Sequence, residues 1–323
     1  MIELAPDDAA IRAARGPKTP VDPRRPYALH VEPERSRGGR IEDIATVFLT
    51  NRECPFTCLM CDLWTHTMDH SVSPGDILEQ LDFALAELPP TRHIKLYNAG
   101  NFFDAKAIPK KDRAALAGRL REFETVVIEN HPSLCGPAVT EFASLLSGEL
   151  EVAMGLETVH PEVLPRLNKQ MTAADFRAAS EWLVARGVSV RAFVLLRPPF
   201  LTEREAVEWA LKSVEFALES GADVCSIIPT RGGNGIMERL AAKGAFAPPQ
   251  LASLEEAQLR GLQLRGLEGA GSRRVFVDLW DAPQLEACPS CGPARIERMR
   301  AMNHTQIARK PALCMCQQRQ GMS

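Results

Sequence analysis

Three cysteines stand close together in the segment NRECPFTCLMCDLW. Cys54, Cys58 and Cys61 are spaced C-x3-C-x2-C. Thiolates are the usual ligands of iron–sulfur clusters, and a cubane cluster holds four irons. Three cysteines on one loop can therefore bind three irons of a [4Fe-4S] cluster and leave the fourth iron open to a small chelating ligand. The alternative is a zinc site, which needs four ligands and would take His66 or His70 as the fourth.

A second group of cysteines lies near the end of the chain. Cys288 and Cys291 form a C-x2-C pair, and Cys314 and Cys316 form a C-x-C pair. Two such pairs can make a tetrahedral site of four thiolates, which suits either zinc or a second iron–sulfur cluster. His304 is an alternative ligand. The other interpretation is four unrelated reduced thiols.

The elements that must position these residues are short β-rich runs that alternate with helical stretches. Several runs are nearly continuously apolar, which is typical of parallel strands covered on both faces. The predicted strands are 44–50, 93–99, 125–130, 151–157, 188–196, 223–230 and 273–280. Strands that alternate with helices imply right-handed βαβ units, so we predict an α/β fold, either a partial (β/α)6 barrel or an open parallel sheet.

Start and stop residues mark the intervening helices. Ser73 and Pro74 suit the first turn of one helix, and Gly148 suits the end of the next. A third helix is expected from Thr172 to Gly187. A fourth begins at Thr202, where Glu205 three residues later completes a capping box.

Polar residues follow several of the predicted strands. In folds of this class ligands bind at the carboxyl ends of the strands. The candidates there are Asn98, Gly100, Asn101, Glu129, Glu157, Arg197 and Thr230. Glycine permits close backbone approach to a ligand, carboxylates can bind hydroxyls or an ammonium group, and arginine suits bidentate binding of carboxylate or phosphate. The alternatives are an ordinary turn at 98–101 and structural ion pairs for the charged residues.

The cysteine loop directly after the first predicted strand resembles the radical S-adenosylmethionine superfamily. The motif of that superfamily is C-x3-C-x2-C, usually with an aromatic residue before the last cysteine, where this sequence has Met60. The resemblance implies a partial barrel of the radical SAM type. It implies that the open iron chelates the amino and carboxylate groups of S-adenosylmethionine. One electron then cleaves a carbon–sulfur bond to give methionine and a 5′-deoxyadenosyl radical.

The same resemblance implies roles for the strand ends. Segment 98–101 would contact the amino group of the cofactor through backbone carbonyls, although the usual form there is Gly-Gly-Glu. The end of the sixth strand, from Ile228 to Thr230, would face the adenine.

Several longer segments narrow the resemblance. They include KLYNAGNFFDAKAIP, VVIENHP, EVAMGLETVHPEVLPRLNKQMT, VLLRPPFLTEREAVEWALKSV and SIIPTRGG. These look like the Elongator-catalytic-subunit-like radical enzymes, and most like the radical-SAM subunit of archaeosine synthase and its bacterial relatives, over residues 44–245 plus the terminal cysteines. That family acts on a modified deazaguanine in the D-loop of tRNA and cleaves a lysine-derived adduct to leave an amidine.

The resemblance therefore implies a radical enzyme that modifies a (deaza)guanine-type nucleoside in tRNA. It also implies an electron donor such as flavodoxin or ferredoxin. Two alternatives stay open. One is a radical enzyme acting on a small metabolite or natural product, and the other is a non-catalytic iron–sulfur or zinc protein.

The charge of the chain is uneven. The formal net charge is -3, so no global basic field points to nucleic acid. From Cys288 onward, however, Glu297 is the only acid and the net charge is +5. The basic residues there are Arg295, Arg298, Arg300, Arg309, Lys310 and Arg319, to which Arg24, Arg25, Arg35, Arg37 and Arg40 would add. This segment is either a solvated tail or a footprint for a phosphate backbone.

Composition completes the expectations. The N-terminus lacks a secretory signal and no apolar run is long enough to span a bilayer, so we expect a cytoplasmic protein with no membrane partner. We expect an irregular N-terminal arm over 1–43 with at most one short helix, a barrel over 44–245, and a Cys-rich extension over 246–323.

Overall fold

The computed structural model describes residues 5–264 and 273–310. Its eight strands form one continuous sheet in the order β1 to β8. The strands are β1 (Ala28–Arg35), β2 (Ile41–Phe48), β3 (His93–Tyr97), β4 (Thr125–Glu129), β5 (Glu149–Glu157), β6 (Ser189–Leu196), β7 (Val224–Pro229) and β8 (Arg274–Val277). β1 is antiparallel to β2, and every later neighbour is parallel.

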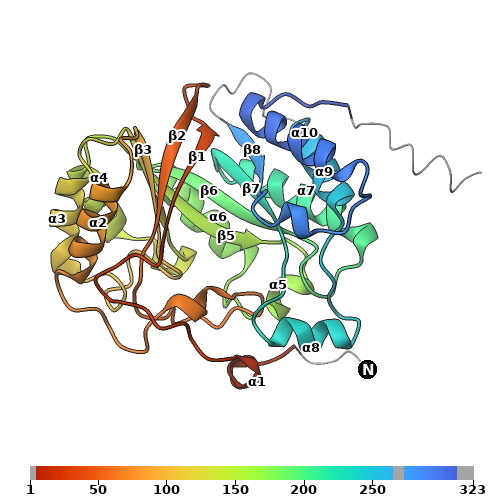
Figure 1. Ribbon diagram of the computed structural model, residues 1–323, viewed down its shortest axis with the longest axis horizontal. Coiled ribbons are helices and arrows are strands. Elements are labelled where there is room, and N and C mark those ends of the chain that lie inside the picture. Colours follow the sequence, from red (N-terminus) through yellow and green to blue (C-terminus); the bar gives the residue numbers. More distant parts are fainter. Residues whose placement is uncertain (1–4, 265–272, 311–323) are drawn as a thin grey trace, which may run out of the picture.

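The sheet curls into a partial barrel, with its helices on the outer face (Figure 1). The prediction of an α/β fold with a partial barrel is confirmed. All seven predicted strands are present, with small shifts at their ends. β1 was not predicted, because its sequence ALHVEPER contains a proline and alternates with charges. The structure gives a physical reason for that pattern, since Glu32 and Glu34 of β1 point into the barrel toward cationic partners.

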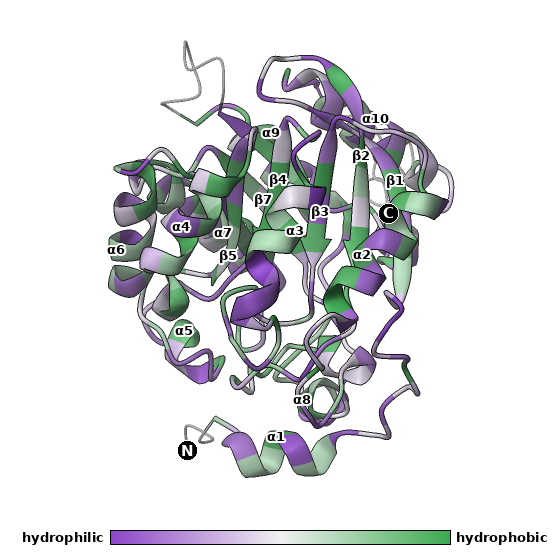
Figure 2. Ribbon diagram, turned by 90° about the vertical axis from the view of Figure 1, so that its left-hand side faces the viewer, coloured by the Kyte–Doolittle hydropathy of each residue, from purple (hydrophilic) through white to green (hydrophobic). Residues whose placement is uncertain are grey.

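Helices connect the parallel strands and cover the outside of the sheet. They are α1 (Asp8–Ala14), α2 (Asp76–Glu87), α3 (Arg113–Arg119), α4 (Pro137–Leu145), α5 (Val163–Arg166), α6 (Ala173–Val184), α7 (Glu203–Glu219), α8 (Ile236–Ala242), α9 (Leu251–Gly261) and α10 (Gly292–Thr305). The described residues also contain the 3-10 turns η1 (Leu63–His66), η2 (Lys110–Asp112), η3 (Pro132–Leu134) and η4 (Ala282–Gln284). Figure 2 shows α2, α3 and α4 on the side that turns toward the viewer and α6 at the left edge. None of the described helices is long and apolar enough to cross a membrane.

The predicted helix caps hold at two of three starts. Thr172 and Asp175 form a capping box at α6, and Thr202 and Glu205 form one at α7. α2, in contrast, begins at Asp76 after Gly75, whose φ of 98° stops the helix from extending back to Ser73. Glycine tolerates this left-handed conformation.

Alternate residues of each strand face different surroundings. One set packs under the helices in the main hydrophobic core, such as Val47, Leu96 and Val152. The other set faces the inside of the barrel, where Ile44, Val127 and Ala153 form a small apolar layer. This period of two is a property of strand geometry.

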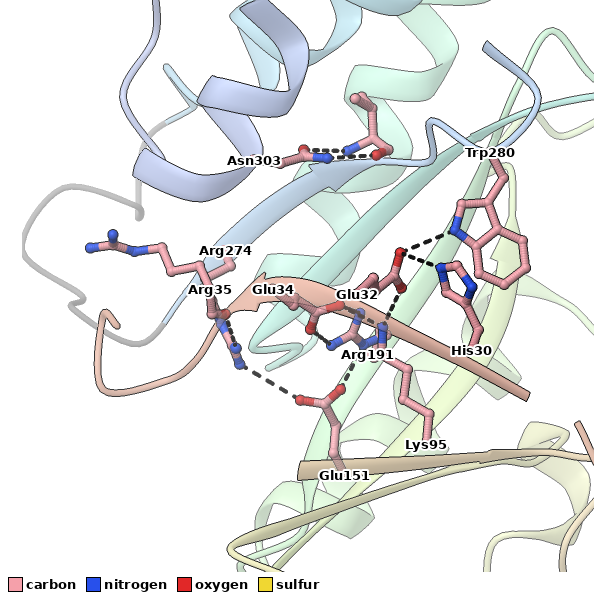
Figure 3. A network of polar contacts seen from close by, with 11 residues as sticks. His30, Glu32, Glu34, Arg35, Lys95, Glu151, Arg191, Arg274, Trp280 and Asn303 are labelled. Atoms are coloured by element: carbon pink, nitrogen blue, oxygen red, sulfur yellow. Dashed lines mark hydrogen bonds and ion pairs between the residues drawn. The ribbon is translucent and has the colours of Figure 1, made fainter. Parts of the chain in front are cut away.

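An ion network closes the amino-terminal end of the barrel interior (Figure 3). Arg191 of β6 pairs with Glu34 and with Glu151, at 2.6 Å in both cases. Lys95 pairs with Glu34 at 2.6 Å, and Arg274 lies 3.6 Å from Glu151. All these side chains are at least four-fifths buried. We refer to these five residues as the floor network.

The N-terminal segment packs against the cysteine loop. Arg12, Arg15 and Lys18, which lie in and just after α1, all pair with Glu53, the residue before Cys54. The Arg15–Glu53 and Lys18–Glu53 contacts are 2.6 and 2.7 Å. The N-terminal segment therefore contains the one short helix that the expectation allowed and also the strand β1, and ion pairs with Glu53 attach it to the cysteine loop.

Helix α10 protects the open edge of the sheet. The side-chain amide of Asn303 accepts from the N–H of Val277 at 3.0 Å and donates to its carbonyl at 2.9 Å. Gln306 does the same for Val275, at 2.7 and 3.1 Å. Two amide side chains thus substitute for a ninth strand, which satisfies backbone groups that an edge leaves unpaired.

Candidate functional site

The cysteine loop lies at the carboxyl ends of the strands, directly after β2. Asn234 fixes it by donating from Nδ2 to the carbonyls of Leu59 and Cys61, at 2.8 and 3.1 Å. The N–H of Leu59 donates to the carbonyl of Leu167 at 2.9 Å. The loop is therefore held from two sides before any ligand binds.

Burial makes the three thiols poor acids in the absence of a cation. It raises the pKa of Cys54 and Cys58 to about 11 and that of Cys61 to about 12. Opposing this effect, the ammonium group of Lys169 lowers the pKa of all three. Thiolates at these positions need positive charge, which is what the irons of a cluster supply.

Lys169 was not predicted from the sequence. It lies between α5 and α6, only 9% exposed, and its Nζ donates to Glu157 Oε1 at 2.6 Å. Burial alone would lower the pKa of Lys169, but the carboxylate of Glu157 and the neighbouring thiols raise it. Gly155 makes room for this pair, because a Cβ there would collide with both charged groups. One feature of the sequence could have indicated a role for Lys169 in the site. It lies in the short segment 167–172, which has no helical periodicity and follows the strand that ends at Glu157.

Strained backbone marks the ends of three strands. Ala99 after β3, Glu157 at the end of β5 and Arg197 after β6 have φ values of 47°, 64° and 56°. Residues other than glycine rarely adopt this left-handed region, and such strain gathers at functional sites. At Glu157 it accompanies an irregularity in the pairing of β5 with β6.

Glu129 and Asn98 meet where β3 and β4 end. The N–H of Asn98 donates to Glu129 Oε2 at 3.0 Å, and Asn98 Nδ2 donates to Asn51 at 2.8 Å. Asn98 Oδ1 is buried without a hydrogen-bond partner. Burial raises the pKa of Glu129 to about 7, although the N–H groups of Asn98 and Ala99 and the charge of Lys169 oppose it. A carboxyl with a pKa near neutrality and an unpaired amide oxygen suit a ligand that carries an ammonium group.

Asn101 and Gly100 lie against the first cysteine. Asn101 Nδ2 donates to Cys54 Sγ at 3.3 Å, and its Oδ1 accepts from the N–H of His131 at 2.7 Å. A Cβ at Gly100 would lie 3.6 Å from the Cβ of Cys54. The structure therefore brings the predicted segment 98–101 beside the cysteine loop.

Two predicted residues are engaged elsewhere. Arg197 pairs with Glu203 at 2.6 Å and donates to the carbonyl of Pro248 at 2.7 Å. Thr230 Oγ1 donates to the carbonyl of Leu196 at 2.8 Å, and Thr230 is 2% exposed. Both side chains thus support the ends of β6 and β7 in this structure.

Arg231 is a further residue that sequence reasoning missed. It bridges Asp62, next to Cys61, and Asp281 of the loop after β8, at 2.9 and 2.5 Å. The signal was its place directly after a predicted strand, beside a glycine-rich turn.

The described residues contain no group of three His, Cys, Asp or Glu side chains that converges on a single metal ion. His66, offered as a zinc ligand, instead stacks on Tyr27 with ring centroids 4.7 Å apart. A cubane needs a different arrangement, because each thiolate binds its own iron. The three thiols of the loop offer one ligand to each of three irons, and Asn101 Nδ2 donates a hydrogen bond to the sulfur of Cys54.

The second cysteine group is described only in part. Cys288 and Cys291 lie in one turn before α10, where the N–H of Cys291 donates to the carbonyl of Cys288 at 3.2 Å. Cys314 and Cys316 lie outside the described residues.

The basic C-terminal segment is less available than its sequence indicated. Arg295 and Arg298 both bind the carboxylate of Glu255 on α9, and Arg300 pairs with Glu297. In the N-terminal half, Arg37 pairs with Glu149 and Arg40 with Glu42. Arg295 and Arg298 are therefore buried in an internal contact and are not available to a phosphate backbone. Arg37, Arg40 and Arg300 stay about half exposed, and Arg309 and Lys310 are exposed, so for these residues the phosphate footprint stays a prediction.

The barrel, the three-thiolate loop at its carboxyl edge and the polar strand ends together define a class of enzyme. Residues 48–212, about half of the chain, match the Radical SAM superfamily. The chain belongs to this superfamily and is a radical S-adenosylmethionine enzyme. In the superfamily a [4Fe-4S] cluster and S-adenosylmethionine together supply a 5′-deoxyadenosyl radical.

Relatives agree with this assignment. An uncharacterized protein of Methanocaldococcus jannaschii is 24% identical over 86% of this chain and 81% of its own length. Archaeosine synthase subunit beta of Thermococcus kodakarensis is 32% identical over 67% of this chain and 72% of that protein. The same subunit of Methanosarcina acetivorans is 31% identical, and the chain spans 60% of its length.

Solved structures share the fold. Methylornithine synthase superposes with a TM-score of 0.53 at 13% identity, over 83% of this chain and 71% of that one. The Elp3 protein of Methanocaldococcus infernus superposes with a TM-score of 0.50 at 15% identity, over 72% of this chain and 62% of that one.

Proposed function

We propose that this enzyme modifies a (deaza)guanine-type nucleoside in tRNA by radical chemistry. The observation that carries the proposal is the similarity to two archaeosine synthase beta subunits over about two thirds of the chain. It is supported by the resemblance of the strand-end segments to the same family. The experiment that tests it compares RNA with small molecules as substrates.

The site residues receive the following roles in this proposal. Cys54, Cys58 and Cys61 hold the cluster, and no other described side chains offer three thiols at this edge of the sheet. Segment 98–101, through Asn98, Gly100 and Asn101, lies where the amino group of the cofactor would bind. Support comes from the unpaired Oδ1 of Asn98 and from the hydrogen bond of Asn101 to Cys54.

The ion pair of Glu157 and Lys169 completes the cofactor site. Lys169 is the described cation that acts on all three thiols, and it offers donors for a carboxylate. Glu129 and Glu157 are the acceptors beside it. Arg197 and Thr230 shape the same edge through their contacts with Glu203 and with the carbonyl of Leu196.

The test is anaerobic incubation of the reconstituted enzyme with S-adenosylmethionine, a reductant and total tRNA, and separately with a cell metabolite extract. We expect a mass change in one tRNA nucleoside and tRNA-dependent formation of methionine and 5′-deoxyadenosine. The Cys58→Ala variant is the matched control. A mass change in a free metabolite, with none in tRNA, would replace the proposal by a small-molecule reaction. The reductant in the cell would be a flavodoxin or ferredoxin.

We further propose that Cys288, Cys291, Cys314 and Cys316 bind one zinc ion or a second cluster. Its support is the turn that places Cys288 and Cys291 together before α10. Metal analysis of the wild type and of a variant with all four replaced by serine tests it. Equal iron and zinc contents in the two proteins would contradict it.

A further inference from the structure

The interior of the barrel differs between its two ends. Near the carboxyl ends of the strands the inward-facing residues are partly exposed, whereas those nearer the middle are buried. The partly exposed residues are Phe48, Tyr97, Glu129, Phe193, Ile228 and Asp278. The interior is therefore accessible on the side where the cysteine loop lies.

An aromatic wall lines one side of this accessible part. We use that name for Phe48, Tyr97, Phe193, Trp280 and His30. Phe48 contacts Tyr97 and Trp280, with ring centroids 6.0 and 5.5 Å apart, and Trp280 contacts His30 at 5.1 Å. Trp280 is 48% exposed, although it is the largest side chain of the wall.

Trp280 is held in a single orientation from beneath (Figure 3). Its indole N–H donates to Glu32 Oε2 at 3.1 Å, and the same oxygen lies 3.9 Å from His30 Nε2. Glu32 Oε1 in turn accepts from Lys95 at 3.3 Å. An exposed tryptophan that is fixed by a second layer of polar contacts presents a rigid flat face, which is the arrangement of a preorganised binding surface.

Hydrogen-bond acceptors border the same face. Asp278 directly follows β8, two residues before Trp280, and its Oδ1 accepts from the backbone N–H of Trp280 at 2.9 Å. Asp278 and Glu32 place carboxylate oxygens at this edge of the wall, and carboxylate oxygens accept hydrogen bonds from N–H donors. A flat ring that carries several N–H donors along one edge matches both features. Among nucleobases this describes guanine and its deaza analogues, with an N1–H and a 2-amino group.

We propose that Trp280, flanked by His30, stacks the substrate base and that the Asp278 carboxylate accepts from its N–H edge. This inference rests on the proposed function, because it assigns a nucleobase of the guanine type to the accessible interior. It makes Trp280 and Asp278 specificity residues, distinct from the thiols and from Lys169.

The probes are guanosine and inosine 5′-monophosphate, which differ by the 2-amino group. Their affinities are measured by equilibrium dialysis with the anaerobically reconstituted enzyme. We expect Trp280→Ala to weaken binding of the guanosine nucleotide about tenfold or more, as is usual for a stacking residue. Trp280→Phe, which keeps a stacking ring, should retain most of the affinity. Trp182→Ala, at the partly exposed tryptophan of α6, is the matched control and should bind like the wild type.

Asp278→Asn keeps one side-chain oxygen that can accept from the backbone N–H of Trp280. Its other carboxylate oxygen, an acceptor, becomes an amide nitrogen, which is a donor. It should erase the preference for the guanosine nucleotide over the inosine nucleotide. The iron and sulfide contents after reconstitution should be the same in all these variants, which shows that they fold and load the cluster.

The outcomes separate this inference from the proposed function. If Trp280→Ala binds the guanosine nucleotide like Trp182→Ala, or if the wild type binds neither nucleotide, the inference is overturned even if tRNA is modified. If nucleotide binding depends on Trp280 while the enzyme neither binds nor modifies tRNA, the base site stands and the tRNA proposal fails.

Discussion

The two ends of the barrel interior use buried charge in opposite ways. At the amino end, the floor network gives Arg191 two carboxylate partners and Glu34 two cationic partners, all at 2.6 Å. At the carboxyl end, the Glu157–Lys169 pair stands beside thiols, an unpaired Asn98 oxygen and a Glu129 carboxyl that burial holds near a pKa of 7. Each charged group of the floor network has a partner of opposite charge. The carboxyl end, in contrast, keeps an unpaired oxygen on Asn98 and a carboxyl group, Glu129, with a raised pKa.

This difference separates stability from chemistry within one barrel. In barrels of this kind, residues at the carboxyl ends of the strands serve catalysis, and those at the amino ends serve stability. Three residues with strained backbone, Ala99, Glu157 and Arg197, lie at the carboxyl ends of strands. Strain and unpaired polar atoms cost stability, and the helix-covered hydrophobic core offsets that cost.

The largest effect is expected at the cysteine loop. Replacing Cys54, Cys58 or Cys61 by alanine should abolish cleavage of S-adenosylmethionine, because three thiolates are the minimum that hold a cubane with one open iron. Iron, sulfide and 5′-deoxyadenosine are measured after anaerobic reconstitution. Cys225→Ala, a buried cysteine of β7, is the control and should cleave normally. Normal cleavage by any of the first three variants would refute the assignment of that cysteine.

The next effect is expected at the floor. Arg191→Met leaves Glu34 and Glu151 buried without their shared cation. Breaking a buried ion pair in this way costs about 3–5 kcal/mol, which urea unfolding of the protein measures. Under conditions where the variant is folded, 5′-deoxyadenosine formed per cluster should equal that of the wild type. A variant with normal stability but impaired cleavage would place Arg191 in the chemistry and erase the contrast between the two ends.

Lys169→Met makes the corresponding change at the carboxyl end. Arg191→Met and Lys169→Met each remove the cation of a buried ion pair. The first should change the free energy of unfolding but not the cleavage of S-adenosylmethionine, whereas the second should change the KM for S-adenosylmethionine. Loss of a charged hydrogen bond to a ligand costs about 1.5–3 kcal/mol, so the KM for S-adenosylmethionine should rise about 10- to 100-fold. Lys169→Arg should recover part of it. An unchanged KM in the methionine variant would show that Lys169 serves stability alone.

Sequence reasoning succeeded where the signal was local. The C-x3-C-x2-C spacing identified the loop, and apolar runs bounded by polar residues located seven strands and the acids Glu129 and Glu157. It missed what only the fold creates. Pro33 and alternating charges concealed β1, and Lys169 became part of the site because the loop before α6 folds over the cysteines. Arg295 and Arg298 were assigned to a partner because Glu255, some 40 residues away in the chain, could not be seen as their neighbour.

The effect that develops most gradually is a change in the pH dependence of stability, and it tests the buried Glu129 carboxyl at the carboxyl end directly. The pKa of Glu129 is raised by burial from about 4.5 to about 7. The folded protein therefore keeps a proton that the unfolded chain has lost between these pH values, so stability falls as pH rises through this window, by at most about 1.4 kcal/mol per unit. His131, whose pKa burial lowers to about 4, contributes the opposite slope over much of the same range.

Comparing the wild type with Glu129→Gln removes the His131 contribution, because that residue is common to both proteins. Glutamine keeps an oxygen for the N–H of Asn98 but does not titrate. The free energy of unfolding of the cluster-free proteins is measured with urea between pH 4.5 and 8. The wild type should lose stability relative to the variant up to about pH 7 and run parallel to it above. Parallel curves throughout would mean that Glu129 ionises normally and that the carboxyl end is as well satisfied as the floor.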